Sequence, residues 1–175
     1  MIVIVGMAGA GKSTQCKRLS DEKGYQWLAV GDVLRACETG TDRAVMMSGK
    51  VLDDTIVTPI VEGELRRLGD EPEILLDGCP RTLGQAQWLA SKVDPKTRAV
   101  VHLVINDDEA LRRLMLRGRE DDNQEAMRQR FAGYHRDIAP VLGAFMAQSV
   151  PIFEIDANGD QGGVYNQIIE RLSQL

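Results

Sequence analysis

Residues 6–14 read GMAGAGKST and follow directly after the apolar run 2–5. This is a complete GxxxxGK[ST] pattern, in which a strand passes through a glycine-rich turn into a helix. The turn points successive backbone N–H groups at an anion, and the helix dipole also favours negative charge there. Lys12 would reach the terminal phosphates as a point charge, and the Ser13 hydroxyl is placed to bind Mg²⁺. The pattern predicts a polyphosphate site.

A second group of polar residues follows another short apolar run. After residues 74–76 comes DGCPRT at 77–82, and farther along lies RGREDDN at 117–123. An aspartate at the end of a strand in a phosphate-loop protein commonly holds Mg²⁺, often through water, and this would be the role of Asp77. Taken alone, the aspartate is a modest indication.

Five segments in one order resemble those of the nucleoside monophosphate kinases, most closely the adenylate kinase family. The resemblance covers essentially the whole chain. The segments are the phosphate loop, GDVLR at 31–35, DGCPRT with the following Gln85, RLMLRGREDD at 113–122, and the stretch 134–141 before the last apolar run.

This resemblance implies reversible transfer of the γ-phosphoryl group of Mg-ATP to AMP, giving two ADP. It implies Mg²⁺ as the cofactor, no zinc, and ATP, AMP and ADP as the partners. The implied fold class is α/β: a parallel sheet like that of P-loop NTPases, flanked by helices, with a helical NMP-binding insertion and a very short lid. The whole chain, 1–175, would form one domain, divided into a core (1–29, 69–112 and 131–175), an NMP-binding part (30–68) and a lid (about 113–130).

The resemblance also assigns roles to particular residues. Phosphoryl transfer has a loose, highly anionic transition state, so catalysis requires positioned cations more than a strong base. Arginine suits this task because its planar fork binds two phosphate oxygens and stays charged. The implied catalytic residues are Lys12, Arg81, Arg117, Arg119 and Arg130. ATP would be bound by Gly9, Ala10, Gly11, Lys12, Ser13, Thr14, Arg113, Arg117 and Gly159. AMP would be bound by Val30, Arg35, Lys50, Val51, Leu52, Gly78, Cys79, Pro80, Arg81, Gln85, Arg119 and Arg130. The metal would be held by Ser13 and, through water, by Asp77.

The choice of base depends on few residues. Gln85 lies four residues after Arg81, where the family reads the AMP adenine with a glutamine that can donate and accept on one purine edge. Pyrimidine-specific relatives tend to carry asparagine near this position, so Gln85 favours AMP. Val30 departs from the serine or threonine often found before the GD pair, which keeps a UMP or CMP kinase as the alternative.

A second departure concerns the lid. Only Gly118 separates Arg117 from Arg119, whereas short-lid relatives usually place several more residues between these arginines. Closing lids exclude water, so that the phosphoryl group passes to the acceptor and not to solvent. We therefore expect a higher ratio of ATP hydrolysis to transfer than in longer-lid relatives. Alternatively, an oligomer could cover the site in place of a longer lid. A nucleotide-binding module that has lost turnover is the alternative function from another class of protein.

The elements that must position these residues can be seen in the apolar pattern. Short apolar runs at 2–5, 74–76, 100–105 and 152–155 are separated by segments long enough for helical crossovers, which predicts a parallel sheet. Helical periodicity appears after the phosphate loop, over 56–68, over 86–90 and over 111–115, so we expect helices on both faces. Pro59 and Pro140 should kink or start helices.

Composition limits the classes of protein that remain. The 175 residues are 43% hydrophobic, which suits one domain with a real core. A net charge of −5 argues against a nucleic-acid or anionic-membrane partner. Cys16, Cys37 and Cys79 form no CxxC pair, and no apolar run approaches a membrane span. We expect a cytoplasmic protein, monomeric unless an oligomer covers the site.

Overall fold

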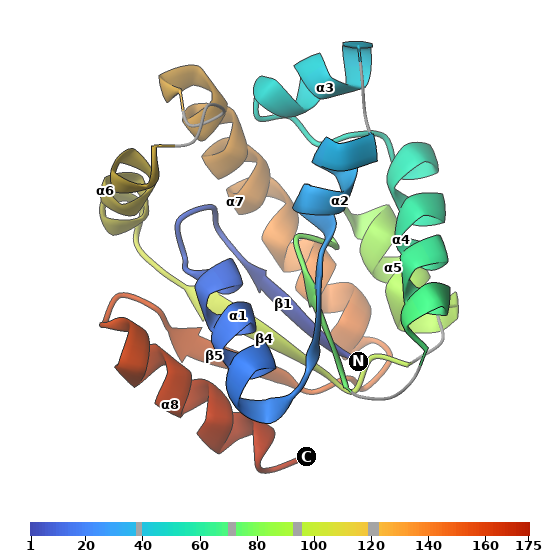
Figure 1. Ribbon diagram of the computed structural model, residues 1–175, viewed down its shortest axis with the longest axis vertical. Coiled ribbons are helices and arrows are strands. Elements are labelled where there is room, and N and C mark those ends of the chain that lie inside the picture. The colour runs from blue at the N-terminus through green and yellow to red at the C-terminus, as the bar shows by residue number, and fades with distance from the viewer. Residues whose placement is uncertain (38–39, 70–72, 93–95, 119–122) are drawn as a thin grey trace.

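The computed structural model describes residues 1–37, 40–69, 73–92, 96–118 and 123–175. Within these ranges the chain forms a single parallel sheet with helices on both faces (Figure 1). None of the helices there combines the length and apolar character needed to cross a bilayer. The expected α/β fold class is confirmed.

Five strands form the sheet in the order β2-β3-β1-β4-β5, and every neighbouring pair is parallel. The strands are β1 (Ile2–Gly6), β2 (Gln26–Ala29), β3 (Ile74–Asp77), β4 (Ala99–Val104) and β5 (Ile152–Asp156). The sequence predicted four of the five. It missed β2, a four-residue edge strand that begins with a glutamine and so shows little apolar pattern.

Each face of the sheet has its own hydrophobic core. On one face, α1 (Lys12–Lys23) and α8 (Gln161–Leu172) pack on the sheet. The other face is covered by α2 (Val30–Cys37), α4 (Asp54–Leu68), α5 (Leu83–Lys92) and α7 (Gln124–Met146). Because both faces are covered, the three central strands, β1, β3 and β4, are nearly continuous apolar runs rather than alternating ones. Figure 1 shows the two remaining helices, α3 (Gly40–Met47) and α6 (Asp107–Arg117), beyond the carboxyl ends of the strands.

Neither proline starts a helix, although a helix start was one of the two outcomes that the sequence predicted. Pro59 lies inside α4 and Pro140 inside α7, both of which run on past the proline. A helical proline loses one backbone hydrogen bond. Buried side chains on the same helices, Val61 in α4 and Val141 and Phe145 in α7, anchor both segments to the core, and tertiary packing outweighs the local cost.

The insertion and the lid take simple forms. Between β2 and β3 the chain forms α2, α3 and α4, which lie within residues 30–68, the range that was predicted to form the NMP-binding part. The expected lid, about 113–130, consists in its described part of the last residues of α6 and the first residues of α7. Residues 119–122, which include Arg119, lie outside the described residues.

Replacing Phe145 with alanine should lower the free energy of unfolding by about 3–5 kcal/mol, because a large, fully buried side chain leaves a cavity. The neighbouring Met146 is 67% exposed, so Met146→Ala should change it by less than about 0.5 kcal/mol. Urea denaturation of both variants measures the difference. Equal midpoints for the two would contradict this assignment of the core.

Candidate functional site

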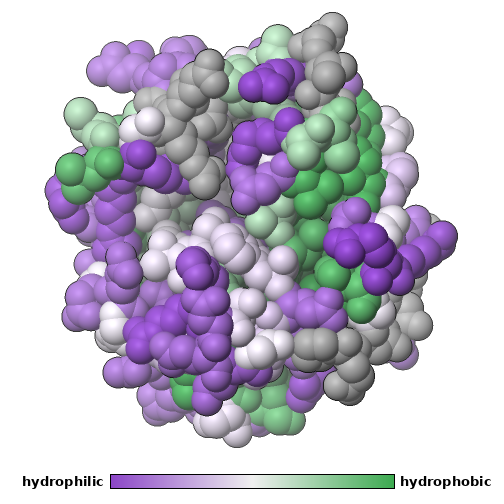
Figure 2. Space-filling model, viewed as in Figure 1, coloured by the Kyte–Doolittle hydropathy of each residue, from purple (hydrophilic) through white to green (hydrophobic). Residues whose placement is uncertain are grey.

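A cleft of about 1720 Å³ opens at the carboxyl ends of the strands. In open parallel sheets, ligands bind at this edge, where the strand order reverses, and here it reverses at β1. Figure 2 shows this face hollowed in its upper half, with strongly hydrophilic side chains at the rim. Since a site for one drug-sized ligand occupies roughly 300–1000 Å³, the cleft has room for two ligands.

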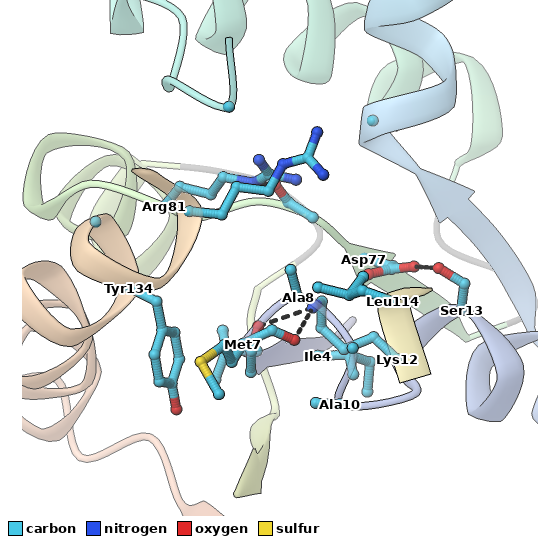
Figure 3. Close-up of a pocket in the computed structure, with 18 of the residues that line it drawn as sticks. Ile4, Met7, Ala8, Ala10, Lys12, Ser13, Asp77, Arg81, Leu114 and Tyr134 are labelled. Atoms are coloured by element: carbon cyan, nitrogen blue, oxygen red, sulfur yellow. Dashed lines mark hydrogen bonds between the residues drawn. The ribbon is translucent and has the colours of Figure 1, made fainter. Parts of the chain in front are cut away.

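The phosphate loop forms one wall of the cleft. Gly9 and Gly11 both have φ of 90°, a left-handed conformation that suits glycine, and Ala10 N donates to Met7 O at 3.1 Å to close the turn. The Lys12 ammonium lies across the loop and donates to the carbonyls of Gly6 (2.7 Å) and Met7 (3.0 Å), as Figure 3 shows. The loop therefore already has the shape that surrounds an anion.

The pKa of Lys12 is lowered to about 8, mainly because the side chain is buried, with smaller contributions from the nearby charges of Arg81 and Arg117. The carboxylate of Asp77 opposes this shift. The pKa is lowered because the ammonium group loses hydration at the bottom of the cleft, where two guanidinium groups already supply positive charge. A bound phosphate would supply the missing counter-charge, so the lysine is suited to an anionic ligand.

Ser13 and Asp77 come together beside this lysine. The Ser13 hydroxyl, in the first turn of α1, donates to Asp77 Oδ2 at 2.7 Å, and Asp77 ends β3 with a 5% exposed side chain (Figure 3). These are hard oxygen donors of the kind that Mg²⁺ prefers, and two protein oxygens leave room for water and phosphate ligands. The pair therefore fits Mg²⁺. In the described ranges, no three or more His, Cys, Asp and Glu side chains gather in a way that could hold a metal ion.

The opposite wall carries the basic groups assigned to the second ligand. Arg81 Nε donates to Gly78 O at 2.9 Å, and Arg35 on α2 forms an ion pair with Asp32 one turn earlier. Gln85 on α5 is only 1% exposed, and its carboxamide is bonded to the Arg81 backbone and to Asp54. Arg35 and Arg81 thus stand on different elements but line the same cleft.

The α6 side of the cleft is joined to the loop after β5. Arg113 Nε donates to Glu109 Oε1 at 2.7 Å, and its Nη2 donates to the carbonyls of Asn158 (3.3 Å) and Gly159 (3.0 Å). Two arginines hold Glu109 by hydrogen bonds and lower its pKa to about 2, so this carboxylate stays charged. Arg113 and Gly159, predicted separately from the sequence, are therefore in direct contact.

Most of the sequence-predicted site residues line this one cleft. They are Gly9, Ala10, Gly11, Lys12, Ser13, Thr14, Arg35, Lys50, Val51, Leu52, Asp77, Gly78, Pro80, Arg81, Gln85, Arg113, Arg117, Arg130 and Gly159.

Val30 and Cys79 do not line the cleft. Both are 1% exposed and belong to the core between the sheet and the insertion helices. Burial raises the pKa of the Cys79 thiol to about 12, so it remains protonated. Both residues contribute packing beneath the site, although the resemblance had placed them among the residues that contact AMP.

Asp54, Thr82 and Tyr134 are among the cleft residues to which the sequence analysis gave no role. Asp54 begins α4 next to the capping residue Asp53, where a carboxylate is expected on helix-dipole grounds alone, so its sequence context carried no further signal. Tyr134 lies on α7 beyond the lid, and its hydroxyl is 2.8 Å from Nε2 of the buried His102.

Comparison with known proteins finds similar sequences over nearly the whole chain. The sequence model of the adenylate kinase family matches residues 4–150. The adenylate kinase of Hyphomonas neptunium is 33% identical over 186 positions, covering 99% of this chain and 98% of that protein. Those of Agrobacterium fabrum (34% over 190 positions; 98% and 96%) and Thermus thermophilus (32% over 180 positions; 95% and 94%) are similar over nearly their full lengths.

Because the pKa of Lys12 is about 8, the affinity of the loop for tripolyphosphate should fall as the pH rises through that value. A lowered pKa means that the ammonium form, which attracts the anion, is lost earlier than in an ordinary lysine. The dissociation constant should rise roughly tenfold between pH 7 and pH 9.

Calorimetric titration at several pH values measures this change. Lys12→Arg is the matched control, because arginine stays charged over this pH range. The ligand's own ionisation changes in the same way in both titrations. If the pH dependence is equally steep in both proteins, Lys12 is not the group that titrates.

Proposed function

Because the chain belongs to the adenylate kinase family, we propose that the cleft at the carboxyl ends of the strands binds ATP on the phosphate loop and AMP against α2, α4 and α5. The chain catalyses reversible transfer of a phosphoryl group from ATP to AMP, giving two ADP. The observation that carries the assignment of sites is the continuity of the cleft from Lys12 to Gln85. Two nucleotides in one cavity can be held in line for direct transfer.

The ATP phosphates are assigned to the loop and to Lys12. The lysine now donates to two loop carbonyls, and a phosphate oxygen can take over these bonds without moving the side chain far. Ser13 and Asp77 are assigned to the Mg²⁺ that the family uses with ATP, Asp77 acting through water. The ion would neutralise phosphate charge as it develops. The contact of Arg113 with the carbonyls of Asn158 and Gly159 supports a flat surface for the adenine.

The AMP phosphate is assigned to Arg35 and Arg81, and its base to Gln85. Lys50, Val51 and Leu52, between α3 and α4, line the same part of the cleft and would lie under the base and ribose. Arg117 and Arg130 stand at the ends of α6 and α7 that face the cleft. We assign them, with Arg119, to the charge that builds up on the transferring group. Arginine at such a point stabilises the transition state electrostatically without taking up or releasing a proton.

The proposal includes a cytoplasmic monomer. The sheet, the phosphate loop and the arginines of the cleft all come from one chain, so the described site does not require a second copy. Cys16, Cys37 and Cys79 are free thiols in the structure, in agreement with a reducing compartment.

Replacing Arg81 with alanine tests the assignment of the AMP side. ADP formation from Mg-ATP and AMP should fall about 10²- to 10³-fold in kcat, the usual cost of removing one positioned donor to a developing charge. Arg66 on α4 is a control of the same residue type, since its side chain is 75% exposed and pairs only with Glu62 among the contacts described. Arg66→Ala should leave kcat within a factor of two or so, because surface pairs contribute little. A normal kcat in Arg81→Ala would remove Arg81 from the site.

The short lid should allow water to compete with AMP. The alignment with the Agrobacterium fabrum enzyme spans 190 positions, so that relative carries residues that the 175-residue chain lacks. We expect a higher ratio of ATP hydrolysis without acceptor to ADP formation with AMP than in that enzyme, because less of the site is closed to solvent. Phosphate release measured for both enzymes under one set of conditions decides it. Equal ratios would mean that closure is complete despite the short lid.

A further inference from the structure

The carboxamide of Gln85 is held by two partners of opposite kind. Its Oε1 accepts from the backbone N–H of Arg81 at 2.8 Å, and its Nε2 donates to Oδ1 of Asp54 at 2.9 Å. A backbone N–H can only donate and a carboxylate can only accept. Turning the amide over would place donor against donor and acceptor against acceptor, so only one orientation satisfies both partners.

Asp54 is itself fixed in place. Both of its carboxylate oxygens accept from the Thr82 hydroxyl at 2.9 Å, and the Thr82 oxygen in turn accepts from the Gln85 backbone N–H at 3.1 Å. A Cβ at position 84 would collide with Asp54 Oδ2, so only glycine allows the carboxylate to come this close. The start of α4 is thereby locked to the start of α5.

The fixed orientation determines what Gln85 presents to a ligand. In the described part of the chain, one N–H of Nε2 has no other protein partner, and Oε1 has beyond Arg81 only the Cys79 thiol at 3.6 Å. A thiol is a weak donor that an amino group can replace. Gln85 therefore offers a donor beside an acceptor, always in the same order.

We propose that Asp54 is a positioning residue that sets base specificity by fixing the carboxamide of Gln85. This inference rests on the proposed function, in which Gln85 contacts the acceptor base. Adenine and cytosine carry an unprotonated ring nitrogen beside an amino group, which complements the fixed order of donor and acceptor. Hypoxanthine, guanine and uracil carry a ring N–H beside a carbonyl, which places like groups against each other and leaves buried polar groups unpaired.

The fixed order of donor and acceptor also predicts how the enzyme ranks acceptors other than AMP. Size favours AMP over any pyrimidine, but among pyrimidines the enzyme should accept CMP ahead of UMP. Among purines of the same size it should accept AMP ahead of IMP, which differs from AMP only at the base edge in question.

The experiment compares kcat/KM for AMP and for IMP in wild type, Asp54→Ala, Asp54→Asn and Asp53→Asn. Asp54→Ala should lower the preference for AMP about tenfold, the effect of one lost hydrogen bond. Asp54→Asn keeps one acceptor oxygen and should lower it less. Asp53→Asn makes the same charge change one residue away, at the helix cap, and should leave the ratio unchanged. A ratio of two acceptors in one preparation does not depend on the folded fraction, so loss of stability alone cannot move it.

An unchanged ratio in Asp54→Ala, or an equal fall in Asp53→Asn, would overturn the inference. So would wild-type turnover of UMP at the rate of CMP, a measurement that needs no variant and holds if Asp54→Ala fails to fold. Gln85→Ala distinguishes failure of the proposed contact between Gln85 and the base from failure of the proposed role of Asp54. If Gln85→Ala keeps the preference for AMP, the assignment of Gln85 to the base fails and the role of Asp54 fails with it. If Gln85→Ala loses the preference and Asp54→Ala keeps it, only the role of Asp54 fails.

Discussion

The close approach of the phosphate loop to its neighbours is the constraint on which the rest of this structure depends. A Cβ on Gly6 would lie 2.7 Å from the carbonyl oxygen of Leu103 in β4, and one on Gly9 would lie 2.5 Å from that of Ala110 in α6. Real Cβ atoms do not come so close, so the loop can pass between β4 and α6 only with glycine at both positions. The loop lies at the carboxyl end of β1, the middle strand of the sheet, and it lines the cleft there.

The cleft is lined by positively charged side chains, although the whole chain carries a net negative charge. The protein carries a net charge of −5, yet the cleft gathers Lys12 with several arginines, and the lowered pKa of Lys12 shows how little hydration remains at its base. Exposed arginines on the helix surfaces, such as Arg18 and Arg67, form ion pairs with glutamates on the same helix. The positive charge gathered in the cleft attracts phosphate groups, and the acidic remainder of the surface discourages larger polyanions.

The link between α4 and α5 connects structure to selectivity. Asp54, Thr82 and Gln85 form one hydrogen-bonded unit, although 31 residues separate its ends. The unit fixes a buried amide, and the hydrogen bonds at its two ends specify one orientation more firmly than apolar contacts would. The cost is that Gly84 and Asp54 cannot vary independently, because the carboxylate occupies the space that a larger side chain at position 84 would need.

Local patterns were sufficient for much of this protein. The phosphate loop and four of the five strands follow from runs of sequence in which spacing, glycine and charge agree, because a strand–turn–helix phosphate site is built from consecutive residues. The family resemblance added most of the other predicted residues that line the cleft. Tertiary structure alone decided the rest. It kept α4 and α7 continuous through Pro59 and Pro140, recruited Gln26–Ala29 as an edge strand, and buried Val30 and Cys79 below the cleft. It also gave Asp54 a partner in Gln85. Each of these depends on contacts between segments far apart in the chain, and such contacts outweigh local propensity without leaving a mark on the neighbouring residues.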